Sequence, residues 1–145
     1  MAPKLTFLGT GSAITTDPDN YQSNLLLEVG RRRLLLDCGG DARRSLAARG
    51  LGATDSDAVY ISHLHADHVG GLEWLGFATH FHPKCSRPIL YCPESLVEPL
   101  WSQVLSGGMR HIVGREATLS TYFDVRPVAV QAGFCFESVT LKLVP

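Results

Sequence analysis

The segment HLHADH, residues 63–68, constrains the fold more than any other part of this 145-residue chain. It places three of the six histidines and one aspartate within six positions. The apolar run AVYIS before it is typical of a buried strand, and the spacing of apolar residues in VGGLEWLGFATHF after it favours a helix. A strand, a polar loop and a helix in this order predict a ligand site at the carboxyl end of a strand.

The residue types of this loop indicate metal binding. An extended backbone would present His63, His65 and Asp67 on one side, with His68 at the turn into the helix, where two glycines permit tight geometry. Imidazole nitrogens and carboxylate oxygens bind zinc, iron or manganese, and zinc is expected first. Four donors within six residues exceed what one tetrahedral ion accepts from so short a loop, so we expect two ions.

The expected division is His63 and His65 on one ion, and Asp67 and His68 on the other. Two neighbouring metal ions can share a water molecule and lower its pKa toward neutrality, which generates a nucleophile. Asp67 would orient this nucleophile and is therefore the predicted catalytic residue. In the less favoured alternative, the loop is merely polar and its histidines cap the helix or bind one another.

The remaining patterns predict a mixed α/β fold. The apolar runs SNLLLEV and RRRLLLDCG flank Gly30 and predict a hairpin that is buried on both faces. Asp41 and Gly50 flank ARRSLAAR and predict a short helix that both residues cap. In PESLVEPLWSQVL, the interior proline favours a helix that starts at Pro99 after a loose turn. Further strands are expected in KLTFLGTG, PILYC, YFDVRPVAV and SVTLKLV.

Composition narrows the class of protein. The length corresponds to one domain, and the net charge of −1 creates no general attraction to nucleic acid or to membranes. The run Arg31–Arg33 is interpreted as a solvated hairpin tip rather than a phosphate-binding patch. Four cysteines without CxxC spacing indicate reduced thiols. No segment has the pattern of a signal peptide or of a transmembrane helix, so a cytoplasmic location is predicted.

The motif HLHADH, followed by VGGL, resembles the HxHxDH motif of the metallo-β-lactamase superfamily. The resemblance covers essentially all of the chain. The segments that are similar to the ribonuclease Z-like branch, which includes other phosphodiesterases, are LTFLGTGSA, SNLLLE, RLLLDCG and RPILYCPESL. The resemblance implies that His63 and His65 bind the first metal, that Asp67 and His68 bind the second, and that Asp37 supports the loop from beneath.

This resemblance also implies a hydrolase with two zinc ions, or with manganese or iron in their place. Its expected substrate is a phosphodiester bond in RNA or in a nucleotide-like small molecule. Hydrolysis of a thioester, lactone or amide bond is the alternative on the same fold. A non-catalytic half that acts only by binding a partner is an alternative of another class. The turn Gly9–Ser12 is interpreted first as a tight turn and second as a substrate-facing loop.

The family fold is a sandwich of two sheets with helices outside, made of two similar halves with the metal site between them. The second half supplies two more histidines and a bridging aspartate, as well as a histidine that protonates the leaving group. No histidine follows His111 and no aspartate follows Asp124. Residues 1–145 are therefore expected to be the N-terminal portion of one such domain, half of an αββα sandwich without its second half.

A half sandwich would leave an apolar sheet face and an open sheet edge uncovered. A homodimer, or pairing with the missing C-terminal half, is the expected consequence. His80, His82 and His111 lie outside the motif, and we expect them at the surface or in loops rather than as metal ligands.

Overall fold

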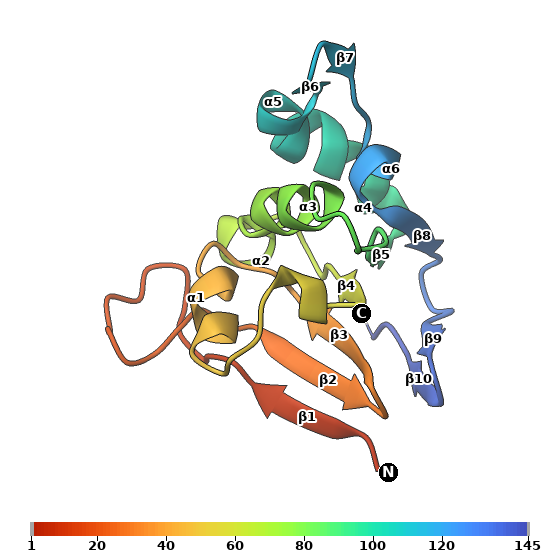
Figure 1. Ribbon diagram of the computed structural model, residues 1–145. Helices are drawn as coiled ribbons and strands as arrows, with labels where there is room; N and C mark the ends of the chain where they lie inside the picture. Colours follow the sequence, from red (N-terminus) through yellow and green to blue (C-terminus); the bar gives the residue numbers. More distant parts are fainter. Residues whose placement is uncertain (1, 145) are drawn as a thin grey trace.

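A computed structural model describes residues 2–144 of the chain, and these residues form a six-stranded mixed sheet with the order β1-β2-β3-β4-β5-β8 (Figure 1). The strands are β1 Lys4–Phe7, β2 Leu25–Val29, β3 Arg32–Leu36, β4 Ala58–Tyr60, β5 Ile89–Pro93 and β8 Asp124–Val128. The pairs β1–β2 and β2–β3 are antiparallel, whereas β3, β4, β5 and β8 run parallel. The mixed α/β class expected from the sequence is confirmed.

The hairpin of β2 and β3 is buried on both faces, as the continuous apolar runs predict. Leu26 pairs with Leu35 in register, and both pack into the larger core cluster. The neighbouring pair, Leu27 and Leu34, belongs to a second cluster. Successive side chains of a strand point to opposite faces, so the two clusters lie on opposite sides of the sheet. Gly30 forms the hairpin tip with a φ of 62°, which glycine adopts without strain.

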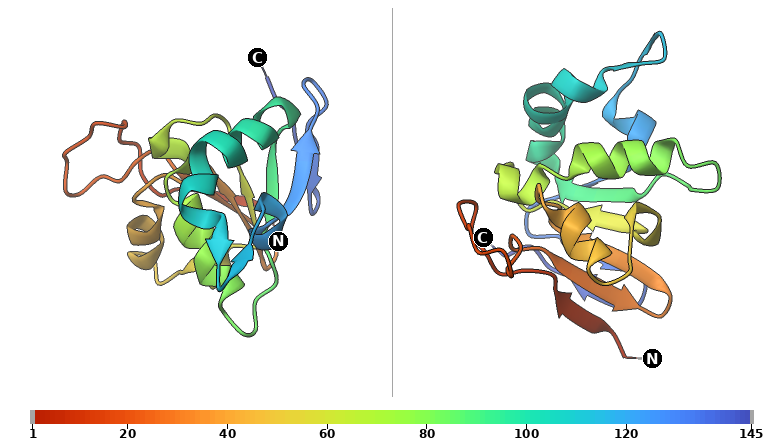
Figure 2. Two further views of the ribbon diagram at one scale, coloured as in Figure 1. Left: turned by 90° about the horizontal axis from the view of Figure 1, so that it is seen from above. Right: turned by 60° about the vertical axis from the view of Figure 1, so that its left-hand side comes forward.

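Helices cover one face of the sheet, and α1 and α3 lie together on that side (Figures 1 and 2). Leu46 of α1 and Leu72 and Leu75 of α3 pack into the core, and each of these side chains is at most 1% exposed. The helices are α1 Ala42–Ala47, α2 Ala66–Val69, α3 Leu72–His80, α4 Glu94–Pro99, α5 Ser106–Met109 and α6 Leu119–Tyr122. A short 3₁₀ helix spans Ala53–Asp55, and two small strands, β6 His111–Ile112 and β7 Arg115–Glu116, form a separate hairpin.

A small hairpin of β9 Phe134–Phe136 and β10 Val139–Leu141 covers part of the opposite face (Figure 2). The ring of Phe134 stacks on that of Tyr91 at a centroid distance of 4.1 Å. Toward the edge of this face, Leu5 and Phe7 of β1 are 51% and 58% exposed. The expected uncovered apolar surface is thus present at β1, while the hairpin shields the face over β5.

Three local expectations are wrong. The helix around the interior proline begins at Glu94 rather than at Pro99, and it continues as a π-helical segment over Leu100–Leu105. Proline lacks the N–H that would continue the helical hydrogen-bond ladder and crowds the preceding turn, so the regular α-helix ends at Pro99. The late strands are shorter than expected, because Tyr122 ends α6, β8 begins at Asp124, and β10 spans only Val139–Leu141.

The third wrong expectation is the cap of α1. Gly50 does follow the helix in the left-handed conformation, with a φ of 71°. Asp41 occupies the N-cap position, but its side chain makes no capping hydrogen bond. Its Oδ2 instead accepts a hydrogen bond from the backbone N–H of Gln22 at 2.8 Å. The backbone of Gln22 has thus replaced the helix N-terminus as the partner of Asp41. Sequence periodicity does not reveal such a long-range contact.

None of the helices in the described part of the chain is long and apolar enough to cross a membrane. The cysteines there are free thiols, and Cys38 and Cys92 are completely buried. Burial, with a contribution from the charge of Asp37, raises the pKa of Cys38 to about 12. Burial also raises the pKa of Cys92 to about 11.

These thiols give a test of the fold. At pH 8, both buried thiols are expected to stay protonated and shielded, and only the thiolate reacts with iodoacetamide. We therefore expect rapid alkylation of the exposed Cys135 in the native chain, and slow alkylation of Cys38 and Cys92. Unfolding in urea should expose them all. Peptide mass spectrometry of timed samples measures this, and rapid native labelling of Cys38 would contradict the described core.

Candidate metal centre

The histidine-rich loop lies at the carboxyl end of the parallel strands. Tyr60 ends β4, and Ile61 still donates a backbone hydrogen bond to Tyr91 of β5 at 2.9 Å. The chain remains extended to His65, whose φ and ψ are −68° and 147°, and α2 begins at Ala66. The extended backbone that would present His63, His65 and Asp67 on one side therefore ends two residues before Asp67. Asp67 and His68 both lie on the first turn of α2.

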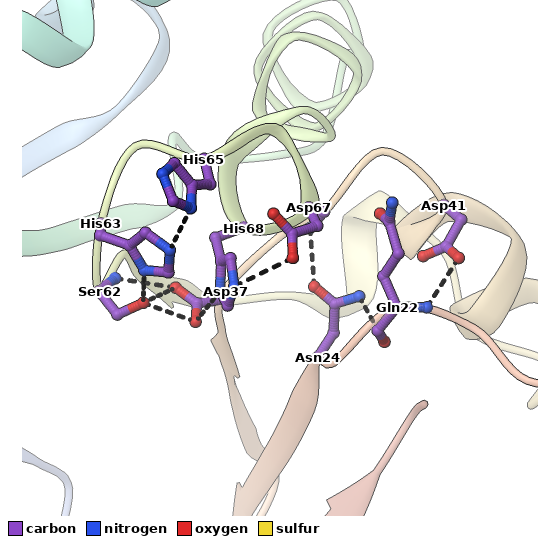
Figure 3. A network of polar contacts seen from close by, with 10 residues as sticks. Gln22, Asn24, Asp37, Asp41, Ser62, His63, His65, Asp67 and His68 are labelled. Carbon is purple, nitrogen blue, oxygen red and sulfur yellow. Dashed lines mark hydrogen bonds and ion pairs between the residues drawn. The ribbon is translucent and has the colours of Figure 1, made fainter. Parts of the chain in front are cut away.

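The four predicted ligands cluster together, and their atoms fall into two pairs (Figure 3). The Nε2 atom of His63 lies 3.2 Å from the Nδ1 atom of His65. The Nε2 atom of His68 lies 3.3 Å from Oδ2 of Asp67. The rings of His63 and His68 connect the two pairs, with centroids 4.0 Å apart. The pairs are the same ones that the resemblance assigns to the first and the second metal ion.

These separations fit a shared metal ion. Two ligand atoms that are each about 2.0–2.1 Å from a tetrahedral zinc ion lie roughly 3.3 Å apart. Imidazole and carboxylate donors also suit the chemistry of zinc. Within residues 2–144, however, no group of three or more histidine, cysteine, aspartate or glutamate side chains is arranged to hold a metal ion. Each pair of the loop thus offers two candidate donor atoms, and neither pair forms a complete site by itself.

A direct hydrogen bond between the rings of His63 and His65 would give the same separation. The contacts behind the loop favour the ligand interpretation. Asp37 Oδ2 lies 2.7 Å from Nδ1 of His68, and Ser62 Oγ lies 3.0 Å from Nδ1 of His63. A histidine that donates its Nδ1–H to such a partner keeps a lone pair at Nε2. Both Nε2 atoms are therefore available to a metal.

Asp37 supports the loop as expected, and it does so through a serine that the sequence analysis did not identify. The Asp37 carboxylate accepts hydrogen bonds from the backbone N–H of Ser62 at 2.8 Å and from the Ser62 hydroxyl at 2.8–2.9 Å. With its proton directed to Asp37, the hydroxyl can accept the Nδ1–H of His63. Only its position directly before the first histidine of the motif could have drawn attention to Ser62.

A buried side chain, Asn24, also lay outside the sequence-based prediction. It is completely buried, and its Oδ1 accepts the backbone N–H of Gly39 at 2.7 Å, while its Nδ2 donates to the carbonyl of Gln22. Gly39 in turn contacts the metal loop closely, because a Cβ atom there would lie 2.2 Å from the carbonyl oxygen of Asp67. Asn24 thus holds the segment on which the loop rests (Figure 3).

The electrostatics of the loop favour a neutral ligand. Burial lowers the pKa of His63, and the neighbouring charges of His68 and His65 lower it further, against the smaller opposing effect of Asp37 and Asp67. The His63 ring is therefore neutral over a wider pH range than an ordinary histidine. A neutral imidazole is the form that binds metal.

The other three histidines contact different partners. His80 ends α3, and its ring packs against Phe81 and Tyr122. The Nδ1 atom of His82 accepts the backbone N–H of Lys84 at 3.3 Å. His111 is exposed on β6.

The segment Gly9–Ser12 is not itself a tight turn, so its first interpretation is wrong. Gly11 instead forms an isolated parallel bridge with Gln22, and the turn follows at residues 13–14. Gly11 donates its backbone N–H to the carbonyl of Tyr21 at 2.8 Å. A Cβ atom at Gly9 would lie 2.2 Å from the same oxygen, so only glycine fits this approach.

The fold and the loop place this chain in a known structural class. The YhfI protein of Bacillus subtilis, a metallo-β-lactamase-fold protein, has a TM-score of 0.65 and 24% identity over 90% of this chain and 47% of that one. The short form of human tRNase Z gives a TM-score of 0.63 with the same identity and coverage. A diphosphatase of the PhnP family gives 0.68 at 19% identity, over 97% of this chain and 56% of that one. The chain has the metallo-β-lactamase fold.

The sequence comparison identifies the family within this class. The family model described as Anti-Pycsar protein Apyc1 matches residues 3–145. The protein of that name from Paenibacillus harenae is 39% identical over 97% of this chain and 57% of its own length. The one from Saccharibacillus brassicae is 44% identical over 87% of this chain and 50% of its own length. The chain belongs to the Apyc1 family of anti-Pycsar proteins, and it spans about half the length of these relatives.

The contact of Asp37 with the loop gives a test of the centre. The substitution Asp37→Asn keeps the shape and tolerates the left-handed φ of 64°, but it removes the charge that orients His68. We expect zinc affinity to fall about 10- to 100-fold, as for other residues that orient metal ligands. Competition with a chromophoric chelator measures this affinity. Asp19→Asn removes the same charge from an exposed loop and serves as the control. Equal affinity of the two variants would contradict the role of Asp37.

Proposed function

We propose that this chain carries one wall of the active site of a zinc-dependent phosphodiesterase. The observation that carries the proposal is the division of the loop's donor atoms into two pairs, His63 with His65 and Asp67 with His68. The rings of His63 and His68 are neighbours, and Ser62 and Asp37 contact their Nδ1 atoms. The Nε2 atoms of both rings are thereby left for a metal ion. When bound there, two zinc ions would supply Lewis acidity and a nucleophile at neutral pH.

The residues of the chain have distinct tasks in this proposal. Asp37 and Ser62 fix the tautomers and the orientation of the two histidines that they contact. Asp67 is 9% exposed and points toward His68, so its carboxylate is held in place to bind and to orient the attacking group. His65 is the exposed member among the proposed ligands of the loop.

The proposed substrate is a small nucleotide-like phosphodiester. The net charge of −1 offers little attraction to a long RNA backbone, whose binding by proteins depends on many basic contacts. Two solved structures with this fold are named for phosphate chemistry, a tRNase and a diphosphatase, but at their low identity they support the fold rather than the substrate. A thioester, lactone or amide is the competing substrate class, which experiment must separate.

A substrate panel tests the proposed function. We expect slow but measurable hydrolysis of bis-p-nitrophenyl phosphate and of a 3′,5′-cyclic nucleotide, a mononucleotide whose phosphate is a diester, and none of a thioester panel. His65→Asn should lower the rate by more than about 100-fold because it removes a metal ligand. His111→Asn changes an exposed histidine outside the loop and should leave the rate unchanged. Preference for thioesters, or equal rates of the two variants, would refute the proposal.

Metal content gives a separate prediction for this chain by itself. Because each donor pair of the loop supplies two ligands and zinc prefers four, we expect at most one tightly bound zinc ion per chain and weak hydrolysis. Elemental analysis by mass spectrometry after desalting measures the stoichiometry. Two tightly held zinc ions per chain, together with turnover, would show that the chain completes both sites without further ligands.

A further inference from the structure

A polar cavity of about 300 Å³ opens at the edge of the sheet opposite to the metal loop. Its lining includes Arg32, Ile89 and Asp124, which are the first residues of β3, β5 and β8. Asp57, directly before β4, also contributes. The cavity therefore lies at the amino ends of the parallel strands, whereas the histidine-rich loop follows the carboxyl end of β4. We propose that this cavity binds the phosphate group of a small phosphorylated ligand.

The charges of the lining favour an anion. Four basic and two acidic side chains face the cavity, so their sum is two positive charges. Both carboxylates are already neutralised, because Arg32 pairs with Asp57 at 3.2 Å and Arg126 pairs with Asp124 at 2.8 Å. The positive charges of Lys84 and Arg87 then remain.

The guanidinium of Arg87 is held in place. Its Nη1 donates a hydrogen bond to the backbone carbonyl of Ser120, which leaves its other N–H groups free to donate elsewhere. A fixed guanidinium beside an ammonium group is a combination that suits a phosphate, through forked hydrogen bonds from arginine and a point charge from lysine.

A buried hydroxyl provides a second, independent observation. Ser56 lines the cavity and is only 5% exposed. Within residues 2–144, its Oγ atom has no hydrogen-bond partner. An unpartnered buried hydroxyl is costly and rare. The Oγ atom is sealed from solvent, so the Ser56 side chain has to rotate about χ1 to donate its proton to an oxyanion in the cavity. Further hydroxyl donors in the same lining come from Thr54 and Ser86.

The surroundings favour a small molecule that extends beyond its phosphate group. A neighbouring hollow of about 540 Å³ shares Thr79, Cys85 and Arg87 with the cavity and adds Arg115 and Ser120. A phosphate bound between Lys84 and Arg87 would lie beside this shared wall. The hollow would then hold the remainder of the ligand, such as a nucleoside. This binding needs neither the metal loop nor the proposed hydrolysis.

Residue-resolved NMR of the metal-free chain tests this site directly. In the presence of EDTA and at constant ionic strength, inorganic phosphate and a nucleoside 5′-monophosphate are titrated separately. We expect saturable shifts of the backbone amides of Ser56, Ser86 and Arg87, and none over residues 62–68. Tighter binding of the nucleotide identifies a nucleotide ligand, and equal affinities identify free phosphate. Shifts that are confined to residues 62–68, or no saturable shifts, overturn the proposal.

Matched variants separate a specific site from general charge attraction. Lys84→Gln should weaken phosphate binding roughly threefold or more, whereas Lys142→Gln, which removes the same charge elsewhere, should leave it unchanged. Ser56→Ala should weaken binding about tenfold without lowering the melting temperature, because the hydroxyl has no partner to lose within residues 2–144. Equal effects of the two lysine variants, or unaltered binding by Ser56→Ala, would overturn the proposal.

Discussion

The carboxylate of Asp37 is the interaction on which the candidate metal centre depends. It follows β3, and it contacts both Ser62, which follows β4, and His68 on the first turn of α2. This reach is possible because β3 and β4 are parallel neighbours whose carboxyl ends meet at one edge of the sheet. The backbone of Asp37 adopts the left-handed conformation, and its carboxylate thus fixes both ends of the segment that runs from Ser62 to His68.

Backbone packing reinforces this arrangement. Cys38 donates its N–H to the carbonyl of His68, and Gly71 donates to the carbonyl of Cys38, both at 2.8 Å. A Cβ atom at Gly71 would lie 2.4 Å from the carbonyl of Gly39. The tight geometry expected of the glycines after the motif therefore comes from close approach rather than from a positive φ. The loop is held on a rigid base by the chain itself, which preorganises its ligands.

The sequence predicted the parts of this structure that periodicity and motif spacing encode. The buried hairpin, the helix over Leu72–His80 and the position of the histidines after a buried strand were all accessible in this way. Three other features could not be predicted from these patterns, namely the start of α2, the role of Ser62 and the burial of Asn24. The hydrogen bonds involved join residues 15–31 positions apart, so they depend on which strands pair. Asp41 shows the same limitation, since a distant backbone group replaced its local capping role.

The two donor pairs bear on what kind of metal site this chain can form. A structural zinc site surrounds its ion with four protein ligands, whereas a catalytic site keeps a position open for water or substrate. Six consecutive residues cannot enclose two ions, and the structure shows why: His63 and His65 extend from the end of the strand, while Asp67 and His68 turn away with the helix. The loop therefore presents its donors as a wall. If an ion were bound by these donors, it would keep positions open for water or substrate, which is what the proposed hydrolysis would need.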